Sequence, residues 1–419
     1  MRFLLLNQCF YPDVVATAQH LTDLAKELSL RGHEVTVVTS DRGYDDPTKS
    51  FPRYESWNNI QIYRVPSLSF GKETKLQRAL NFGSFLITCA LRLFTLRRFN
   101  VVVGLTSPPL ISFLASLFVA IKGGRFCFWV MDLNPDEAIA AGWLEENSLT
   151  ASYLKRMLRH SLRRADQTIV LDRFMRERVL SKDIDANRVS IVPPWSHDDS
   201  VSYSTEGRRS FRSTHDLENK FVVMYSGNHS PCHPLDTLLN AALVMSSQDG
   251  YAFCFIGGGS EQNKVRDFAK LHRLKNILCL PYQPLKKLSD SLSAADLHVV
   301  VLGQKFAGIV HPSKIYNIMT IGVPMLYIGP QQSHIMDLAA DLGPTYLFTA
   351  QHGDVDGAVQ RISEAARVSC ARDNESRSTV AERFSRHALL PQMMSLLEFD
   401  TSNDPSILEA TQQPSVKAQ

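Results

Sequence analysis

The sequence of 419 residues has almost no net charge and few cysteines. Its 45 basic and 42 acidic residues leave a formal charge of +3, so no bulk positive field indicates a nucleic-acid partner. Its seven cysteines include no C-x-x-C pair. This pattern argues against a disulfide framework or a zinc ribbon, and it predicts a protein of the reducing cytoplasm.

The sequence also lacks a long uninterrupted hydrophobic run. The apolar start, Phe3–Leu6, is shorter than the apolar region of a signal peptide. The uncharged stretch 99–121 is interrupted by Pro108-Pro109, which leaves Leu110–Ile121 as a continuous apolar helix. A bilayer span needs about 20 residues, so this stretch predicts a buried strand, a turn and a packed helix instead.

What the chain does contain is a regular alternation of strand and helix patterns. Phe3–Leu6 predicts a buried strand, and it is followed by a helix with apolar residues at i, i+3, i+4 and i+7 and by a strand at Glu34–Thr39. Such a unit predicts parallel pairing with a right-handed crossover. Further strands are predicted at 101–103, 125–131, 168–171, 189–192, 221–225, 252–256, 277–280, 297–301 and 324–328.

The alternation divides into two series, which predicts two doubly wound α/β domains. Pro193-Pro194 and a polar stretch to about residue 220 separate them, so we expect one domain at 1–205 and a second at 206–385. Residues 401–419 are polar and aperiodic and predict a disordered tail. Because such domains bind ligands at the carboxyl ends of their strands, two facing domains would share one cleft.

The segment His311-Pro312-Ser313-Lys314 leads into an amphipathic helix that stops at Gly322. Ser313 is a suitable N-cap, whose hydroxyl would accept a hydrogen bond from a first-turn N–H. A helix start with a nearby lysine indicates an anion site. The alternative is an ordinary capped helix with a surface lysine.

The segment 225–237 predicts a second anion-binding element. A strand ends at Tyr225, and Ser226-Gly227 forms a loop with Asn228, His229 and His233, whose asparagine and histidine side chains could donate to a phosphate. A tight strand–helix loop with incidental polar residues is the alternative.

A third glycine-rich segment, Gly257-Gly258-Gly259, follows the strand 252–256. It would let the backbone approach a ligand closely. It matches neither G-x-G-x-x-G nor a Walker loop, and a plain turn explains it equally well.

Asp132 ends the predicted strand 125–131 and would face the cleft, where a carboxylate could accept a proton or hold a sugar hydroxyl. Capping is the alternative role. Asp136 and Glu137 suit the first turn of a helix. The loop after the first strand, Tyr11–Thr17, has the position of a ligand loop, although it contains no glycine.

Arginines punctuate the apolar region 79–121, at positions 78, 92, 97 and 98. Arginine beside exposed leucine and phenylalanine can dock on anionic lipid, which predicts peripheral attachment to the inner face of a membrane. A solvated face over a packed core is the alternative.

Taken together and in order, these segments resemble the family-four glycosyltransferases of the GT-B fold, in particular bacterial enzymes that build surface polysaccharides of the colanic-acid and O-antigen type. The resemblance covers about residues 1–400 and rests on FLLLNQCFYPD, LAKELSLRGHEVTVVTS, DLNPDEAIAAGWL, ADQTIVLDRFMRERVL, VSIVPPW, MYSGNHSPCHPLDTLL, FIGGG, LPYQPLKKLSDSLSAADLHVV and HPSKIYNIMTIGVP.

The resemblance implies two Rossmann-like domains, an acceptor on the first, a nucleotide-sugar donor on the second, and a helix at 386–400 that crosses back to the first domain. It implies transfer with retention of configuration and without a metal ion or other cofactor. Donor diphosphate would lie on the 227–233 loop and at Ser313-Lys314, and the base near Gly258 and Tyr282. The donor-site residues implied are Gly227, Asn228, His233, Gly258, Tyr282, Ile309, His311, Ser313 and Lys314.

The sequence departs from the family pattern at several of these positions. Ile309 and Asn317 occupy the places of two glutamates, and Asn228 and His233 those of an arginine and a lysine. Asp132 stands where relatives carry a histidine. The first loop has Val15-Ala16 in place of a glycine pair, and its acceptor-side residues would be Asp13, Ala16 and Thr17.

These features predict a retaining hexosyltransferase that moves a sugar from a UDP-sugar to a glycan or lipid-linked acceptor, with Asp132, Lys314 and His233 as catalytic residues. One alternative is a nucleotide-sugar 2-epimerase of the same fold. The other is a catalytically silent nucleotide-binding subunit of a polysaccharide assembly complex, which the missing glutamates favour.

Overall fold

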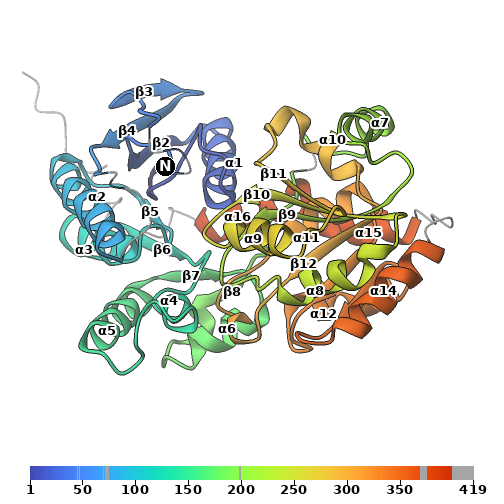
Figure 1. Cartoon of the computed structure of the whole chain (residues 1–419). Coiled ribbons are helices and arrows are strands. Elements are labelled where there is room, and N and C mark those ends of the chain that lie inside the picture. The colour runs from blue at the N-terminus through green and yellow to red at the C-terminus, as the bar shows by residue number, and fades with distance from the viewer. Residues whose placement is uncertain are drawn as a thin grey trace, which may run out of the picture.

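The computed structural model describes residues 1–44, 46, 48–68, 70, 75–197, 200–368 and 375–398. Within these residues the strands form two separate sheets, one in each half of the chain, and helices cover both (Figure 1). The predicted tail at 401–419 and Phe399 lie outside the described residues. The α/β class and the two Rossmann-like sheets confirm the predicted fold.

The first sheet has eight strands among the described residues, in the order β3-β4-β2-β1-β5-β6-β7-β8. Its strands are β1 (Arg2–Leu6), β2 (Glu34–Ser40), β3 (Tyr54–Trp57), β4 (Ile60–Val65), β5 (Val101–Gly104), β6 (Arg125–Trp129), β7 (Gln167–Val170) and β8 (Val189–Ile191). Its helices are α1 (Ala16–Leu30), α2 (Lys75–Thr95), α3 (Ile111–Lys122), α4 (Asp136–Ala140), α5 (Leu149–Arg164) and α6 (Arg173–Leu180).

The second sheet has six strands in the described part of the chain, in the order β11-β10-β9-β12-β13-β14. They are β9 (Phe221–Asn228), β10 (Tyr251–Gly258), β11 (Ile277–Leu280), β12 (Leu297–Val301), β13 (Met325–Ile328) and β14 (Leu347–Ala350). The helices are α7 (Thr205–Thr214), α8 (Asp236–Val244), α9 (Gln262–Leu271), α10 (Leu288–Ser293), α11 (Lys314–Ile321), α12 (His334–Asp337), α13 (Ala339–Leu342), α14 (Val355–Val368), α15 (Glu375–Arg383) and α16 (Arg386–Leu397).

The predicted strands are all present because their apolar runs are buried on both faces of the sheets. Residues 3–6 of β1 and residues 101–103 of β5 are fully buried and pair in parallel with each other. Burying apolar surface at about 25 cal/mol per Å² is what stabilises such central strands. The apolar segment 110–121 is α3, and no helix in the described residues has the length and apolarity needed to cross a membrane.

Three strands are absent from the sequence-based prediction. β14 is a short strand at the edge of the second sheet. β3 and β4 form an antiparallel hairpin around Asn58 and Asn59, whose φ angles are 49° and 59°. A two-residue turn of this kind favours asparagine and glycine, so the Asn-Asn pair was the signal that would have revealed the hairpin.

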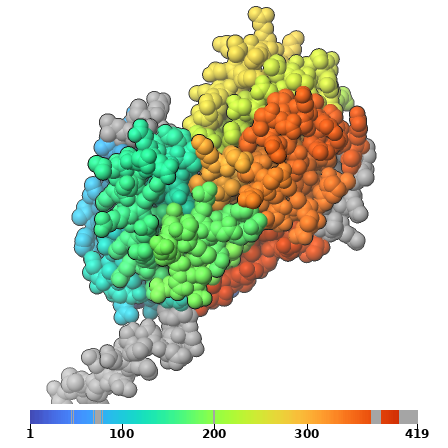
Figure 2. All heavy atoms as spheres, turned by 90° about the horizontal axis from the view of Figure 1, so that it is seen from below, coloured from blue at the N-terminus to red at the C-terminus, as the bar shows by residue number. Residues whose placement is uncertain are grey.

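The end of the chain returns to the first domain, as the resemblance implied. Helix α16 begins after Ser385, whose hydroxyl caps it by accepting from the Ala388 N–H at 3.1 Å. Just beyond α16, the Glu398 carboxylate pairs with Arg31 at 2.9 Å and His33 at 2.7 Å, both of the first domain. Seen from below, the two lobes lie directly against each other (Figure 2).

Candidate functional site

The carboxyl ends of β9 and β10 meet at two glycines. Gly227 pairs with Gly257 and Asn228 with Gly258, so β9 continues three residues past the predicted end at Tyr225. The prediction of a loop at 226–228 is therefore wrong. Both glycines have positive φ, 139° and 136°, and a Cβ on Gly257 would lie 2.0 Å from the Gly227 carbonyl oxygen. Only glycine allows the two backbones to approach this closely.

The paired residues Gly227 and Gly257, with the strand ends around them, are called the glycine crossing below. Lys314 reaches this place from the start of α11. Its Nζ lies 3.7 Å from the centroid of the Tyr225 ring, and a Cβ on Gly227 would be 2.9 Å from the same nitrogen. Within the described residues this buried nitrogen has no hydrogen-bond partner. Burial lowers the pKa of Lys314 to about 7. The ammonium is held by a cation–π contact alone, which leaves its hydrogen-bonding capacity for a ligand.

Ser313 precedes α11, which stops at Gly322 as predicted. The prediction that its hydroxyl caps the helix is wrong: Ser313 has helical φ and ψ of −65° and −15°, and its side chain accepts no capping hydrogen bond. A helical backbone at this residue turns the hydroxyl away from the first-turn N–H groups that a cap must reach. The helix start therefore has no side-chain cap, and the Ile315 and Tyr316 N–H groups bond to the Pro312 and Ser313 carbonyls at 3.5 and 3.1 Å.

His233 lies in the loop after β9, and its Nδ1 is 2.7 Å from the carbonyl oxygen of Val301. Because a carbonyl can only accept, Nδ1 carries the proton. Nε2 of the neutral ring therefore bears a lone pair and is an acceptor. Burial, followed by the nearby Lys314 charge, lowers the pKa of His233 to about 3. His233 can thus donate to a phosphate only after an anion has raised its pKa.

Tyr282 and Gly258 form the outer part of this region. A Cβ on Gly258 would lie 3.0 Å from the Tyr282 ring, and the tyrosine side chain is 45% exposed. The exposed ring beside bare backbone is a surface on which a planar base could stack. Asn228, at the end of β9, is also exposed.

Asp132 follows β6 of the first domain and faces the second domain. Burial, together with the charge of Glu137, raises the pKa of Asp132, and burial raises that of Glu137. Glu137 lies in the first turn of α4, as predicted, but its carboxylate also lies 3.7 Å from the thiol of Cys232, next to His233. Two buried carboxyls that act on each other resist carrying two negative charges at neutral pH.

The remaining predicted donor-site residues lie where the domains touch. The Ile309 carbonyl accepts a hydrogen bond from the Leu133 N–H at 2.9 Å, and its side chain is buried. Asn317, in place of a glutamate, accepts from the His197 N–H at 3.0 Å. His311 does not present its side chain to the glycine crossing, because both ring nitrogens bond to Asp172 and Tyr316.

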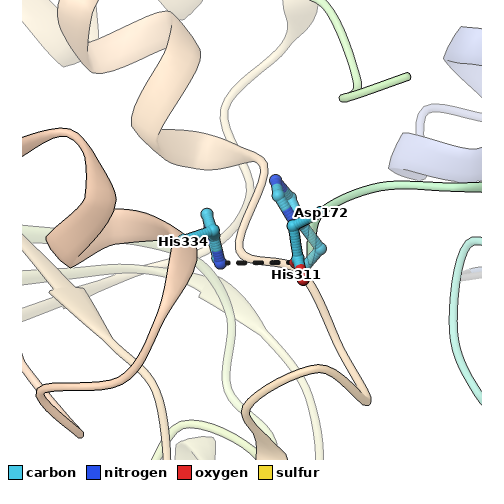
Figure 3. A group of neighbouring side chains, drawn as sticks. All are labelled: Asp172, His311 and His334. Carbon is cyan, nitrogen blue, oxygen red and sulfur yellow. Dashed lines mark hydrogen bonds and ion pairs between the residues drawn. The ribbon is translucent and has the colours of Figure 1, made fainter. Parts of the chain in front are cut away.

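Asp172, His311 and His334 form a buried cluster in which one potential metal-ligand atom from each lies within 4.8 Å of the others (Figure 3). The Asp172 Oδ2 and His311 Nδ1 atoms are 2.7 Å apart, a hydrogen-bond distance. Two ligand atoms on a tetrahedral zinc ion would lie about 3.3 Å apart. The distance between Asp172 and His311 is that of a direct hydrogen bond and is shorter than the spacing of two zinc ligands.

The acceptor-side residues are divided between a loop and a helix. Asp13 lies in the loop, where its carboxylate accepts from the Tyr44 N–H at 3.1 Å. Ala16 and Thr17 belong to the first turn of α1, so their prediction as loop residues is wrong. Ala16 and Thr17 are not helix breakers, as glycine and proline are. Helix α1 begins about one turn earlier than its apolar periodicity indicates.

A separate open hollow of about 600 Å³ lies between α6 and the loops after β12, β13 and β14. Its walls include Phe174, Arg178, Gln304 and Gln331, and no residue of the Lys314 region. The chemistry of the site is instead concentrated at the glycine crossing, where Lys314, His233 and Gly227 come together.

Sequence reasoning missed Asp172 and Tyr225 and assigned Glu137 only a capping role. Tyr225 appeared only as the end of an apolar strand, yet its ring supports the Lys314 ammonium. Asp172 had one usable signal, since it directly follows a predicted strand as Asp132 does. Its partner His311 is 139 residues away, which no local pattern can reveal.

Comparison with known proteins finds similarity to glycosyltransferases. Residues 16–195 match the family described as glycosyl transferase 4-like domain. The chain is 23% identical over 334 residues to WcaI of Escherichia coli (strain K12), named as a colanic acid biosynthesis glycosyl transferase, over 77% of this chain and 82% of that protein. It is 25% identical over 244 residues to a Pseudomonas aeruginosa protein named as the glycosyltransferase WbjE, over 58% and 61%.

Solved structures share the two-domain fold. A sucrose-phosphate synthase from Thermosynechococcus elongatus has a TM-score of 0.74 at 14% identity and covers 94% of this chain and 98% of its own. HepE of Anabaena, in complex with UDP and glucose, has a TM-score of 0.72 at 15% identity, with 95% and 99% covered. WaaG, a lipopolysaccharide-biosynthesis glycosyltransferase, has a TM-score of 0.69 at 14% identity, with 95% and 100% covered. The resemblance seen in the ordered motifs is confirmed.

Proposed function

We propose that this chain, which is a glycosyltransferase of the GT-B fold, transfers a sugar from a UDP-sugar to a glycan or lipid-linked acceptor in surface polysaccharide biosynthesis. Three likenesses support the details: the chain is similar to WcaI, named for colanic acid biosynthesis, to WaaG, named for lipopolysaccharide biosynthesis, and to HepE, which was solved with UDP-glucose. Transfer would retain the anomeric configuration and need no metal ion.

The observation that carries this proposal is the buried Lys314 ammonium, which lacks a hydrogen-bond partner among the residues described. A lysine kept in such a position destabilises the free protein, since burial disfavours its charge. A diphosphate lying on the Gly227–Gly257 backbone would accept its hydrogen bonds and neutralise it. The start of α11 would add the positive end of the helix dipole.

In the transfer step, the bond between the anomeric carbon and the diphosphate oxygen breaks, and the acceptor oxygen forms the new bond on the same face. The departing diphosphate gains the negative charge and takes the acceptor proton. Lys314 and the positive end of the α11 dipole would stabilise that charge without a cation. His233 would join them as a donor once the charge of the diphosphate has raised its pKa, so that Nε2 takes up a proton from water.

Asp132 would act from the other side of the cleft. Because its pKa is raised, the Asp132–Glu137 pair retains a proton at neutral pH. A protonated carboxyl both donates and accepts hydrogen bonds, so the pair would orient a sugar or acceptor hydroxyl. It would be a weak general base in this state, in agreement with proton transfer to the leaving diphosphate.

We further propose that the enzyme attaches peripherally to an anionic membrane surface through α2. Ile87, Leu91 and Phe94 lie along this helix, and each is more than 60% exposed, at 65%, 62% and 68%. Helix α2 lies at the outer edge of the first domain (Figure 1). Of the arginines considered above, Arg92 stacks on Tyr63 at 3.8 Å, whereas Arg97 is exposed and could contact lipid phosphate.

The proposal is tested by measuring UDP release from a panel of UDP-sugars with and without an acceptor extract from bacterial membranes. We expect release that depends on the extract and persists in EDTA. Lys314→Ala should weaken UDP binding about 10- to 100-fold in calorimetry, the effect of a charge-assisted hydrogen bond.

Release of UDP without acceptor, with epimerised sugar, would identify a 2-epimerase, which the glycosyltransferase relatives do not favour. Tight UDP binding without release would identify a silent binding subunit. Loss of transfer in EDTA would overturn metal independence, and unchanged UDP affinity in Lys314→Ala would remove Lys314 from the site.

A further inference from the structure

Asp172 connects the two domains at the point where the donor helix begins. It follows β7 and caps α6, because its Oδ1 accepts the Met175 N–H at 2.8 Å. Its other oxygen, Oδ2, accepts a hydrogen bond from Nδ1 of His311, in the second domain, at 2.7 Å. Figure 3 shows the carboxylate beside the His311 and His334 rings.

His311 also contacts α11, through a hydrogen bond with Tyr316 of that helix. Since a carboxylate only accepts, His311 Nδ1 carries the proton, and Nε2 shares a hydrogen bond of 2.7 Å with the Tyr316 hydroxyl. His311 and Tyr316 stand on either side of Ser313 and Lys314. The Asp172–His311–Tyr316 chain therefore holds the start of α11 from both sides and ties it to the first domain.

The surroundings of Asp172 keep its carboxylate ionised. Burial alone would raise the pKa of Asp172, but the His311 hydrogen bond and the nearby imidazoles lower it to about 2. The His334 ring stacks on His311 at 3.7 Å, and burial keeps its pKa well below the usual range, so it stays neutral. Burial, followed by the nearby His197 and His311 rings, lowers the pKa of His20, in α1, well below its usual value.

The donor groups and the acceptor-side acid belong to different domains. Lys314, Gly227 and Gly257 all belong to the second domain, whereas Asp132 belongs to the first. UDP can therefore bind without the connection between domains, but transfer needs the two half-sites at one distance. A displacement of about 1 Å between reacting groups can reduce a rate about 100-fold.

We propose that Asp172 is a positioning residue for sugar transfer, which sets the start of α11 against the first domain through His311 and Tyr316. This inference rests on the proposed function. Asp172 touches no reacting group, so its contribution belongs to the turnover step and not to donor binding.

The test is Asp172→Asn, measured by UDP calorimetry and by UDP release with acceptor extract. Asparagine is as good a helix cap as aspartate, so the Oδ1 bond to Met175 and the fold are retained. Its amide NH₂ would face the His311 N–H, and the chain would be broken. We expect kcat to fall at least tenfold while the UDP dissociation constant stays within about twofold.

The matched control is Asp337→Asn, which removes an exposed ion pair with Arg173 at 2.7 Å across the same interface and should leave kcat unchanged. In a double-mutant cycle, Asp172→Asn with His311→Asn should cost no more than the larger single effect. If Asp172→Asn behaves like the control, or loses UDP affinity in proportion to kcat, the inference is wrong. If the wild-type protein neither binds UDP nor releases it, the proposed function itself fails.

Discussion

Lys314 is a residue whose buried charge lowers the free energy of unfolding of the unliganded protein. Its ammonium is buried, its pKa is lowered to about 7, and Tyr225 is its only close favourable contact described here. Between pH 7 and the ordinary lysine pKa of about 10.4, the unfolded chain binds a proton that the folded one does not. Stability from this group is therefore lowest below pH 7 and rises with pH.

We predict that Lys314→Met raises the melting temperature by several degrees at pH 7 and weakens UDP binding about 10- to 100-fold. Methionine fills a similar volume without a buried charge, so the desolvation cost disappears. Thermal unfolding followed by circular dichroism checks the first part, and calorimetry the second. A lower melting temperature at pH 7 would mean that the ammonium is satisfied in the free protein.

The same pKa predicts proton uptake when UDP binds. At pH 8 the free Lys314 is mostly neutral, whereas the bound diphosphate requires the ammonium, so binding should take up close to one proton. UDP affinity should fall up to about tenfold for each pH unit above 7. Calorimetry in two buffers of different ionisation enthalpy measures the uptake, and Lys314→Met, tested at high UDP, should show none.

Among the elements, β9 and β10 expose their backbones where their carboxyl ends meet, because the residues there are glycines without side chains. Gly227 and Gly257 let the ends of the two parallel strands lie so close together that a single methyl group on Gly257 would clash with the Gly227 carbonyl oxygen. The exposed backbone there lies next to Lys314. A phosphate could approach this backbone directly.

We predict that Gly257→Ala destabilises the protein by about 1–3 kcal/mol and weakens UDP binding at least tenfold, since its Cβ would lie 2.0 Å from a backbone oxygen. Gly250→Ala is the control, because a Cβ there meets nothing within 4 Å and β10 begins at the next residue. Urea unfolding and UDP calorimetry separate the two variants. Equal behaviour of both would show that the crossing tolerates a side chain.

For the whole molecule, the exposed apolar residues of α2 predict a membrane-contacting surface. We expect the wild-type protein to co-sediment at low salt with vesicles containing phosphatidylglycerol, and the Ile87→Glu/Phe94→Glu variant to remain in solution. Acidic residues would remove the apolar contact and repel the lipid headgroups. UDP affinity should be unchanged, because α2 is remote from the glycine crossing (Figure 1).

Leu271→Glu is the matched control, since Leu271 ends α9 of the second domain and is 76% exposed. This variant should still co-sediment with the vesicles. If wild-type protein fails to bind, or if Leu271→Glu abolishes binding as well, α2 is not the membrane-contacting surface.

Much of the architecture follows from the sequence alone, because strands and helices arise from local periodicity. Apolar runs such as Val101–Val103 must be buried on both faces, and parallel strands separated by helices must form doubly wound sheets. The order of the motifs then indicated the resemblance to glycosyltransferases, and Gly227, His233 and Lys314 were predicted from it as site residues. Hairpin β3–β4 escaped only because its Asn-Asn turn was not recognised.

The state of the site residues was decided by the tertiary structure. The low pKa of Lys314, the tautomer of His233 and the pairing of Asp172 with His311 depend on burial and on partners distant in sequence, 139 residues in the last case. Local pattern reports which chemical groups are present and which element they belong to. Charge, proton position and reach arise only when two folded domains remove those groups from water and bring them together.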